Sequence, residues 1–262
     1  MNKIFIFLAS LIICSNTLVA QSGGSIGSTG LRWDFDGVNT LTISATAGIE
    51  TMPNYNETSN RPDWETHKDK IKSVIIEDGI ASIGHLAFYN HGNLNSVEIS
   101  SSVTSIGGWV FDGCTSLTHI NIPNSVTSMG FGVFNNCTSL THINIPNSVT
   151  SIGNLTFYNC TSLTQINIPN SVTSIGIQTF ESCTSLTHIN IPNSVNSIRN
   201  VAFQYCTSLT SIILHAETPP TTFDNSAFHN IYSTPLTLYV PAQSKHLYDA
   251  SQSTAPWDVL TI

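Results

Sequence analysis

Charged side chains are scarce in this sequence. Asp, Glu, Lys and Arg make up 9% of its 262 residues, with 8 basic and 16 acidic side chains and a net charge of −8. Between Cys114 and Tyr205 the charged residues are Glu181 and Arg199 alone. Nucleic acids and anionic membranes are both bound through clusters of Lys and Arg, and the sequence has no such cluster. The composition therefore argues against both kinds of partner.

Long hydrophobic runs are also missing after the first twenty residues. Near the N-terminus, Lys3 precedes the apolar run Ile4–Ile13, which is too short to span a bilayer. This arrangement predicts a signal peptide of residues 1–20 and a mature chain that begins at Gln21. Lipid attachment at Cys14 is an alternative, but the residue before it is bulkier than such a signal requires. We expect a secreted or cell-surface protein without a membrane span.

Motifs of catalysis are lacking too. The sequence contains no P-loop, no H-E-x-x-H and no G-x-G-x-x-G. Gly23–Gly27 spells G-x-S-x-G, but we expect residues 21–28 to be a flexible Ser/Gly leader, which offers no scaffold for a nucleophile elbow. In the uncharged middle of the chain Glu181 has no second carboxylate for acid–base work. We predict no enzyme activity, no catalytic residue, no cofactor and no metal ligand.

The sequence does contain a repeated unit, with seven copies between Lys68 and Asn230. Four copies are nearly identical, and three have diverged. A fixed period of about 23 residues predicts coils that stack into a solenoid, which suits binding better than catalysis in one pocket. The similar copies begin at Cys114, Cys137, Cys160 and Cys183, and the diverged ones at Lys68, His91 and Cys206.

One copy suffices to predict the shape of a coil. In the copy that begins at Cys137, Leu140 and Ile143 belong to an L-x-x-L-x-L strand pattern, and Pro146 ends the strand. A bend follows at Gly153, and a short helical turn buries Phe157. Repetition of the Leu and Phe positions predicts two core columns, Ile71, Leu94, Leu117, Leu140, Leu163, Leu186 and Leu209 in one, and Phe88, Phe111, Phe134, Phe157, Phe180, Phe203 and Phe228 in the other.

Cysteine opens five of the seven coils. The cysteines that follow the predicted signal peptide are Cys114, Cys137, Cys160, Cys183 and Cys206, always at the first position of a copy. The spacing is not that of a zinc site, and an odd number cannot all pair. We predict a column of small buried side chains. A disulfide between neighbouring coils is the alternative, since strands about 4.8 Å apart bring α-carbons within range.

Segments on either side of the repeats predict caps. Leu31–Phe35 and Thr40–Ser44 alternate around Asp36–Gly37 as a hairpin would, and Pro62–Lys72 has a helical pattern. After the repeats, Leu236–Pro241 predicts a strand and Ala242–Ser253 a helix. The predicted division is a leader and N-terminal cap over 21–67, repeats over 68–230 and a C-terminal cap over 231–262.

The repeat C-x-S-L-x-x-I-x-I-P-x-S-V-x-S-I-G-x-x-x-F resembles the BspA-like leucine-rich repeats of bacterial secreted and surface proteins. The segments around Leu31–Asp34, Tyr239–Pro241 and Trp257 resemble the caps of that family. The resemblance implies an α/β fold, a right-handed solenoid of seven coils with parallel strands on its concave face and short helical turns. It also implies protein binding, and several members of the family are described as adhesins to host matrix proteins.

Outward-facing strand positions form the candidate contact surface. Residues two apart in a strand share a face, so stacking predicts one row of His119, His142, Gln165 and His188 beside another of Asn121, Asn144, Asn167 and Asn190. Three interpretations stay open for these residues. They are a solvated polar surface left by repeat duplication, a contact surface for a protein or glycan, or a metal-binding or proton-sensitive site.

We therefore predict a secreted or cell-surface protein-binding module, an adhesin that contacts host proteins through the concave strand face. The alternative is a passive structural spacer or coat protein, which the near-identity of the copies favours. A glycan-processing enzyme is a third class, and the missing acid, base and nucleophile argue against it.

Overall fold

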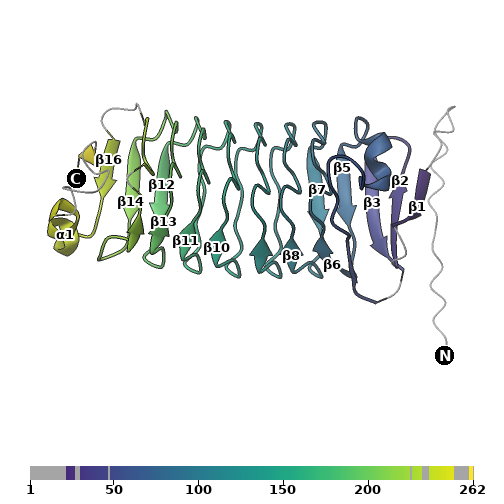
Figure 1. Ribbon diagram of the computed structural model, residues 1–262, viewed down its shortest axis with the longest axis horizontal. Helices are drawn as coiled ribbons and strands as arrows, with labels where there is room; N and C mark the ends of the chain where they lie inside the picture. The colour runs from purple at the N-terminus through teal and green to yellow at the C-terminus, as the bar shows by residue number, and fades with distance from the viewer. Residues whose placement is uncertain are drawn as a thin grey trace.

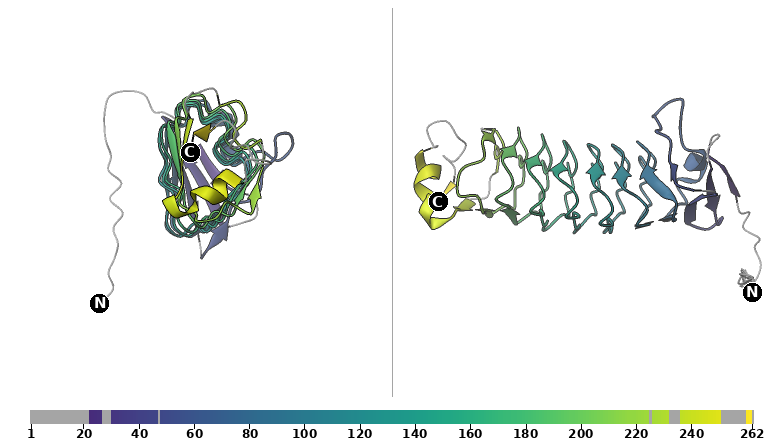
Figure 2. Two further views of the ribbon diagram at one scale, coloured as in Figure 1. Left: turned by 90° about the vertical axis from the view of Figure 1, so that its left-hand side faces the viewer. Right: turned by 90° about the horizontal axis from the view of Figure 1, so that it is seen from below.

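The fold is a rod built of stacked coils (Figure 1). A computed structural model describes residues 22–26, 30–46, 48–224, 226–231, 236–250 and 260–261. Viewed down the rod, the coils lie over one another (Figure 2). Each coil therefore packs mainly on its two neighbours, as in other repeat proteins, and the predicted leucine-rich solenoid is confirmed.

One side of the rod carries the longer strands. They belong to two sheets, and single parallel bridges between Asn121, Asn144, Asn167 and Asn190 connect the middle coils to the second of these sheets. Neighbours pair in parallel from β3 onward, so equivalent residues of successive coils lie side by side. The first sheet holds β1 (Ser22–Ser25), β2 (Leu31–Phe35), β3 (Thr40–Ala45), β5 (Ser73–Ile76) and β7 (Ser96–Ile99), and the second β12 (His188–Ile191), β14 (Ser211–Leu214), β16 (Leu236–Tyr239) and β17 (Leu260–Thr261).

A second side carries short strands, also paired in parallel. The short strands are β4 (Glu50–Thr51), β6 (Ile80–Ile83), β8 (Ser105–Ile106), β9 (Ser128–Met129), β10 (Ser151–Ile152), β11 (Ser174–Ile175), β13 (Ser197–Ile198) and β15 (Thr222–Phe223). Four of them, β9, β10, β11 and β13, follow a Pro-Asn-Ser turn, where proline ends the preceding strand segment because it has no N–H to donate. The rest of each repeat coil consists of hydrogen-bonded turns. The short helical turns that the sequence predicts there are therefore turns rather than helices.

The core consists of side-chain columns that run the length of the rod. Every residue of the predicted Leu and Phe columns is at most 2% exposed. The Phe rings stack between neighbouring coils, with centroids 5.7 Å apart for Phe88 and Phe111 and 5.1 Å apart for Phe203 and Phe228. Each ring is therefore covered on both faces by the coils next to it.

The cysteines form another buried column and are all free thiols. Each Sγ donates a hydrogen bond to the carbonyl of the Phe that stands 26 residues earlier, as from Cys160 to Phe134 at 3.1 Å. The thiols thus point at backbone oxygen atoms rather than at one another, and the disulfide alternative is not realised. Burial raises the pKa of the Cys206 thiol to about 12 and raises the pKa of the other four as well.

The N-terminal cap closes one end of this core. β2 and β3 form the predicted hairpin, and the predicted helix is a shorter 3-10 helix, η1 (Asp63–His67). Trp64 is fully buried, its ring lies 5.8 Å from that of Phe88, and its Nε1 donates to the carbonyl of Ala87. An indole thus covers the end of the Phe column and satisfies its own N–H.

The predicted flexible leader is wrong for residues 22–25. They form β1, which pairs antiparallel with β2 and extends the first sheet by one strand. Glycine makes this possible, since a Cβ on Gly23 would lie 2.7 Å from the carbonyl oxygen of Trp33 and one on Gly24 3.1 Å from its Nε1. Ser25 lies within this strand opposite Arg32, so it does not stand on the strand-to-helix turn of a nucleophile elbow.

The C-terminal cap combines a strand with a helical segment. β16 lies at the predicted strand, followed by the 3-10 helix η2 (Ala242–Ser244) and α1 (Lys245–Ala250). Tyr248 is fully buried, and its hydroxyl donates to the carbonyl of Ala216 at 2.9 Å. The sequence predicts that the helix continues to Ser253, but that part lies outside the described residues, as does Trp257.

His91 interrupts the cysteine column. It begins the second coil, where later coils have Cys, and it is 0% exposed. Its Nδ1 lies 3.2 Å from the carbonyl of Tyr89, so Nδ1 carries the proton, while Nε2 has no hydrogen-bond partner. Burial lowers the pKa of His91, and the carbonyl of Tyr89 and the charge of Glu65 offset this only in part.

We expect the Phe column to dominate the stability of the rod. Phe157→Ala should lower the free energy of unfolding by about 3–5 kcal/mol, because the cavity would lie between two stacked rings. Phe131→Ala is the matched control, since that ring is 50% exposed, and it should cost about 1 kcal/mol or less. Urea unfolding of both variants measures the difference. Equal losses would contradict a stacked core.

We expect His91 to make the protein less stable in acid. Its pKa is lowered on folding, so the stabilisation is present above the unfolded pKa of about 6.5 and is lost as the pH falls below it. His91→Cys restores the cysteine column and removes the pH-dependent contribution of His91 to the free energy of unfolding. The urea midpoint of the wild type should fall more than that of the variant between about pH 7 and pH 5. Parallel curves would show that His91 does not titrate in this way.

We expect all five repeat thiols to be unreactive in the folded protein. Their Sγ atoms are buried and their pKa values are raised, so neither access nor thiolate is available. Iodoacetamide followed by intact-mass analysis should find the five unmodified in the native protein starting at Gln21, and all modified after unfolding. Rapid native modification of any of them would place that thiol at the surface.

Candidate binding surface

The predicted contact residues lie together on the side of the longer strands. In β12 the burial alternates, with His188 and Asn190 exposed and Ile189 and Ile191 buried. The parallel bridges place the four Asn side by side, which aligns the His and Gln positions two residues earlier. We call this surface the polar ladder, formed by His119, His142, Gln165, His188, Asn121, Asn144, Asn167 and Asn190.

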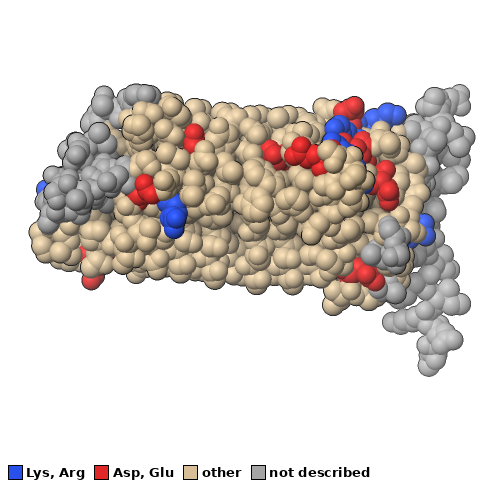
Figure 3. Space-filling view, viewed as in Figure 1, with Lys and Arg blue, Asp and Glu red and all other residues tan. Residues whose placement is uncertain are grey.

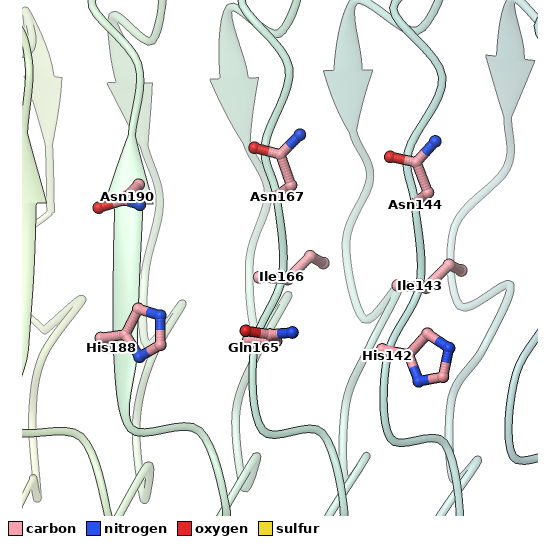
Figure 4. Close-up of a pocket in the computed structure, with 8 residues that line it drawn as sticks. All are labelled: His142, Ile143, Asn144, Gln165, Ile166, Asn167, His188 and Asn190. Carbon is pink, nitrogen blue, oxygen red and sulfur yellow. The ribbon is translucent and has the colours of Figure 1, made fainter.

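A shallow groove of about 340 Å³ runs along the ladder. Six of the eight predicted residues line it, and Figure 4 shows them in two rows, with His142, Gln165 and His188 in one and Asn144, Asn167 and Asn190 in the other. Ile143 and Ile166 lie between the rows, and they are only 5% and 7% exposed. The sequence predicts Ile143 and Ile166 as core residues, and it does not predict that they also line the groove.

Threonine orients the histidines of the ladder. Thr141 Oγ1 donates its one hydrogen to the carbonyl of Thr118, and it lies 3.0 Å from Nδ1 of His142. In the neutral imidazole Nδ1 is therefore the donor, which leaves the lone pair on Nε2. The same Thr–His contact recurs at His119 and His188. Each coil with histidine thus holds its ring against the preceding threonine.

The amides of the groove are available to a ligand. Asn144, Asn167, Asn190 and Gln165 have exposed side chains, and within the described part of the chain no protein group bonds to their carboxamides. Each carboxamide offers two donors and a carbonyl acceptor. The groove therefore presents a row of unused donors and acceptors above a floor of hydrophobic side chains, a pattern common in contact surfaces.

Ring geometry does not favour the metal interpretation. The rings of His119 and His142 are parallel, with centroids 6.0 Å apart and an interplanar angle of 5°. Parallel rings on successive coils direct their nitrogen lone pairs side by side, whereas a metal ion needs ligands that converge. Over the described residues, no group of three His, Cys, Asp or Glu side chains is placed to hold a metal ion.

Charge is absent from the groove and gathers towards one end of the rod. None of the eight residues that line the groove is acidic or a lysine or arginine. Figure 3 shows most Asp, Glu, Lys and Arg side chains near the N-terminal cap, whereas the middle of the rod is nearly free of them. Contacts to the ladder must therefore come from hydrogen bonds and van der Waals packing.

The sequence matches the family model for the BspA type leucine rich repeat region, in six copies over residues 66–161 and 130–251. The chain belongs to this family. No curated protein matches the sequence. Among the described residues, none of the helices has the length and hydrophobicity that a bilayer crossing requires.

Solved bacterial structures share the fold. A leucine rich cell surface protein from Faecalibacterium prausnitzii is 30% identical over 75% of this chain, with a TM-score of 0.56. This chain spans only 55% of that protein. The leucine rich repeat protein of T. pallidum is 22% identical over 71% of this chain and 91% of its own, with a TM-score of 0.53, and this likeness shows the fold alone.

Proposed function

We propose that this protein is a secreted or cell-surface module that binds a protein partner through the polar ladder, and that it acts as an adhesin. Membership of the leucine-rich repeat family supports a binding scaffold. The similarity to a bacterial cell surface protein supports a location outside the cell. The lack of catalytic motifs in the sequence supports binding rather than chemistry.

The unused carboxamides carry the proposal. Polar side chains that serve only solubility are free to be any of several types, and a charged surface would serve better. Here Asn recurs at the same outward position in four successive coils, beside a row of His and Gln. A partner that lies along the groove meets one set of donors and acceptors per coil, so many weak contacts add together.

We expect the Asn row to be needed for binding. The purified chain is tested against an array of host matrix proteins and glycans, with the variant Asn144→Ala/Asn167→Ala/Asn190→Ala beside it. Loss of three central contacts should weaken binding by about tenfold or more, with no change in the melting temperature. Surface plasmon resonance on the positive array members measures the change.

The chain offers a matched control. Asn147, Asn170 and Asn193 are also exposed and recur once per coil, but they lie in the Pro-Asn-Ser turn outside the groove. Their triple Ala variant should bind like the wild type. Equal binding by both variants would remove the ladder as the contact surface. If no array member binds, the spacer or coat role, which the near-identical coils favour, replaces the binding proposal.

A further inference from the structure

The Asn row continues beyond the ladder at both ends. Strand pairing extends it through Asn190, Ile213 and Tyr239 towards the C-terminal cap. In the other direction Glu98 stands one repeat before Asn121 and pairs with Ile75. From Glu98 towards the C-terminal cap, the row therefore runs from an acidic residue, through four neutral amides, to an aliphatic and an aromatic side chain.

The end near the N-terminal cap is acidic beyond Glu98 itself. Glu77 and Asp78 directly follow β5 and line a hollow with Ser100 and Ser101. A second hollow holds Glu77 with Asp34 and Asp36. The ion pairs found among the described residues both use Glu65, so Glu77, Asp78 and Glu98 have no Lys or Arg within salt-bridge distance.

Basic residues do not cancel this charge. In β2, β3, β5 and β7 the charged residues are Arg32, Asp34 and Glu98. Arg32 pairs with Ser44, which lies near the end of β3 beside Glu77, so this cation is at the acidic end and is outnumbered there. Lys72 lies before β5, at the opposite end of that strand from Glu77. The local excess of acid makes this end attractive to a cation over roughly 8 Å at physiological salt.

The Asn row ends near the C-terminal cap in two apolar side chains. Tyr239 is 53% exposed, and Ile213 beside it in the next strand is half-buried. Along the outward rows of the described strands, Tyr239 is the one Phe, Tyr or Trp. An exposed aromatic ring next to an aliphatic side chain is the kind of feature that anchors a protein partner.

We propose that the strand face binds an extended segment of a partner protein in a single orientation. Basic side chains of the segment lie at Glu77 and Glu98, and a large apolar side chain lies at Ile213 and Tyr239. This inference rests on the proposed function and adds the orientation and the length of the bound segment. Charge complementarity identifies a polypeptide, since a neutral glycan has no cation to place beside Glu77 and Glu98.

The length of the segment follows from the stack. Six coil steps separate Glu98 from Tyr239, which is about 30 Å at about 4.8 Å per step. An extended chain covers about 3.3 Å per residue, so about nine residues connect the two anchors. Between them the segment meets only amides and imidazoles, which favours neutral hydrogen-bonding side chains.

The test uses four synthetic peptides of about ten residues on a Ser/Thr/Asn frame, with capped termini and in both chain directions. The first has two Lys at one end and Trp-Leu at the other. The second has Glu in place of Lys, the third has Ser in place of Trp-Leu, and the fourth has both groups at one end. In one direction the first peptide should bind about tenfold tighter than the other three, measured by fluorescence anisotropy at low salt.

Protein variants assign each end. Glu77→Gln/Glu98→Gln should remove the preference for Lys over Glu, with Glu57→Gln/Asp69→Asn as a control of equal charge change at exposed sites. Tyr239→Ser should remove the preference for Trp-Leu, with Tyr205→Ser as its control, since Tyr205 is 40% exposed. A loss of peptide preference in the target variants but not in their controls supports the acidic and the aromatic anchor.

Failure is also informative. If the first peptide binds no better than the others, or not at all up to about 1 mM, the inference is overturned. The proposed function survives that result provided that a matrix protein binds and that the Asn triple variant loses it. If neither peptides nor matrix proteins bind, both proposals fall.

Discussion

Stacking of one coil on the next is the interaction on which the whole structure depends. A single coil has too few apolar groups to offset its conformational entropy, so its Leu, Phe and Cys must be covered by neighbours. Strand pairing sets the step, and the stacked Phe rings between 5.1 and 5.7 Å apart fit it. The end coils need covers for the same reason, which Trp64 and Tyr248 help to provide.

The register that builds the core also builds the surface. Because each Asn lies directly beside the Asn of the next coil, a residue type chosen once is displayed in a row. The unused carboxamides of Asn144, Asn167, Asn190 and Gln165 thus line one groove. The turns opposite tolerate more variety, as the change from Phe131 to Asn154 at one repeat position illustrates.

Periodicity predicted the coils, both core columns and six of the eight residues that line the groove, because burial repeats with the sequence. It missed β1, because Ser-Gly-Gly-Ser has low strand propensity. This strand forms through the close approach of Trp33, a contact that the local sequence does not reveal. Periodicity also missed Tyr239 as part of the Asn row. The repeat period would place Leu236 beside Ile213, but Ile213 pairs with Tyr239 because the coil that contains Pro219 and Pro220 is longer than the others.

Uniform coils create a problem of register that the ends of the row resolve. A partner that contacts only the four Asn can shift by one coil and keep three of its four contacts, so the bound register is poorly defined. The same ambiguity affects strands whose sequences repeat. Residues that differ at the two ends remove it, because a shift separates a cation from Glu98 or an apolar group from Tyr239. The diverged coils thus supply the specificity that the identical coils cannot.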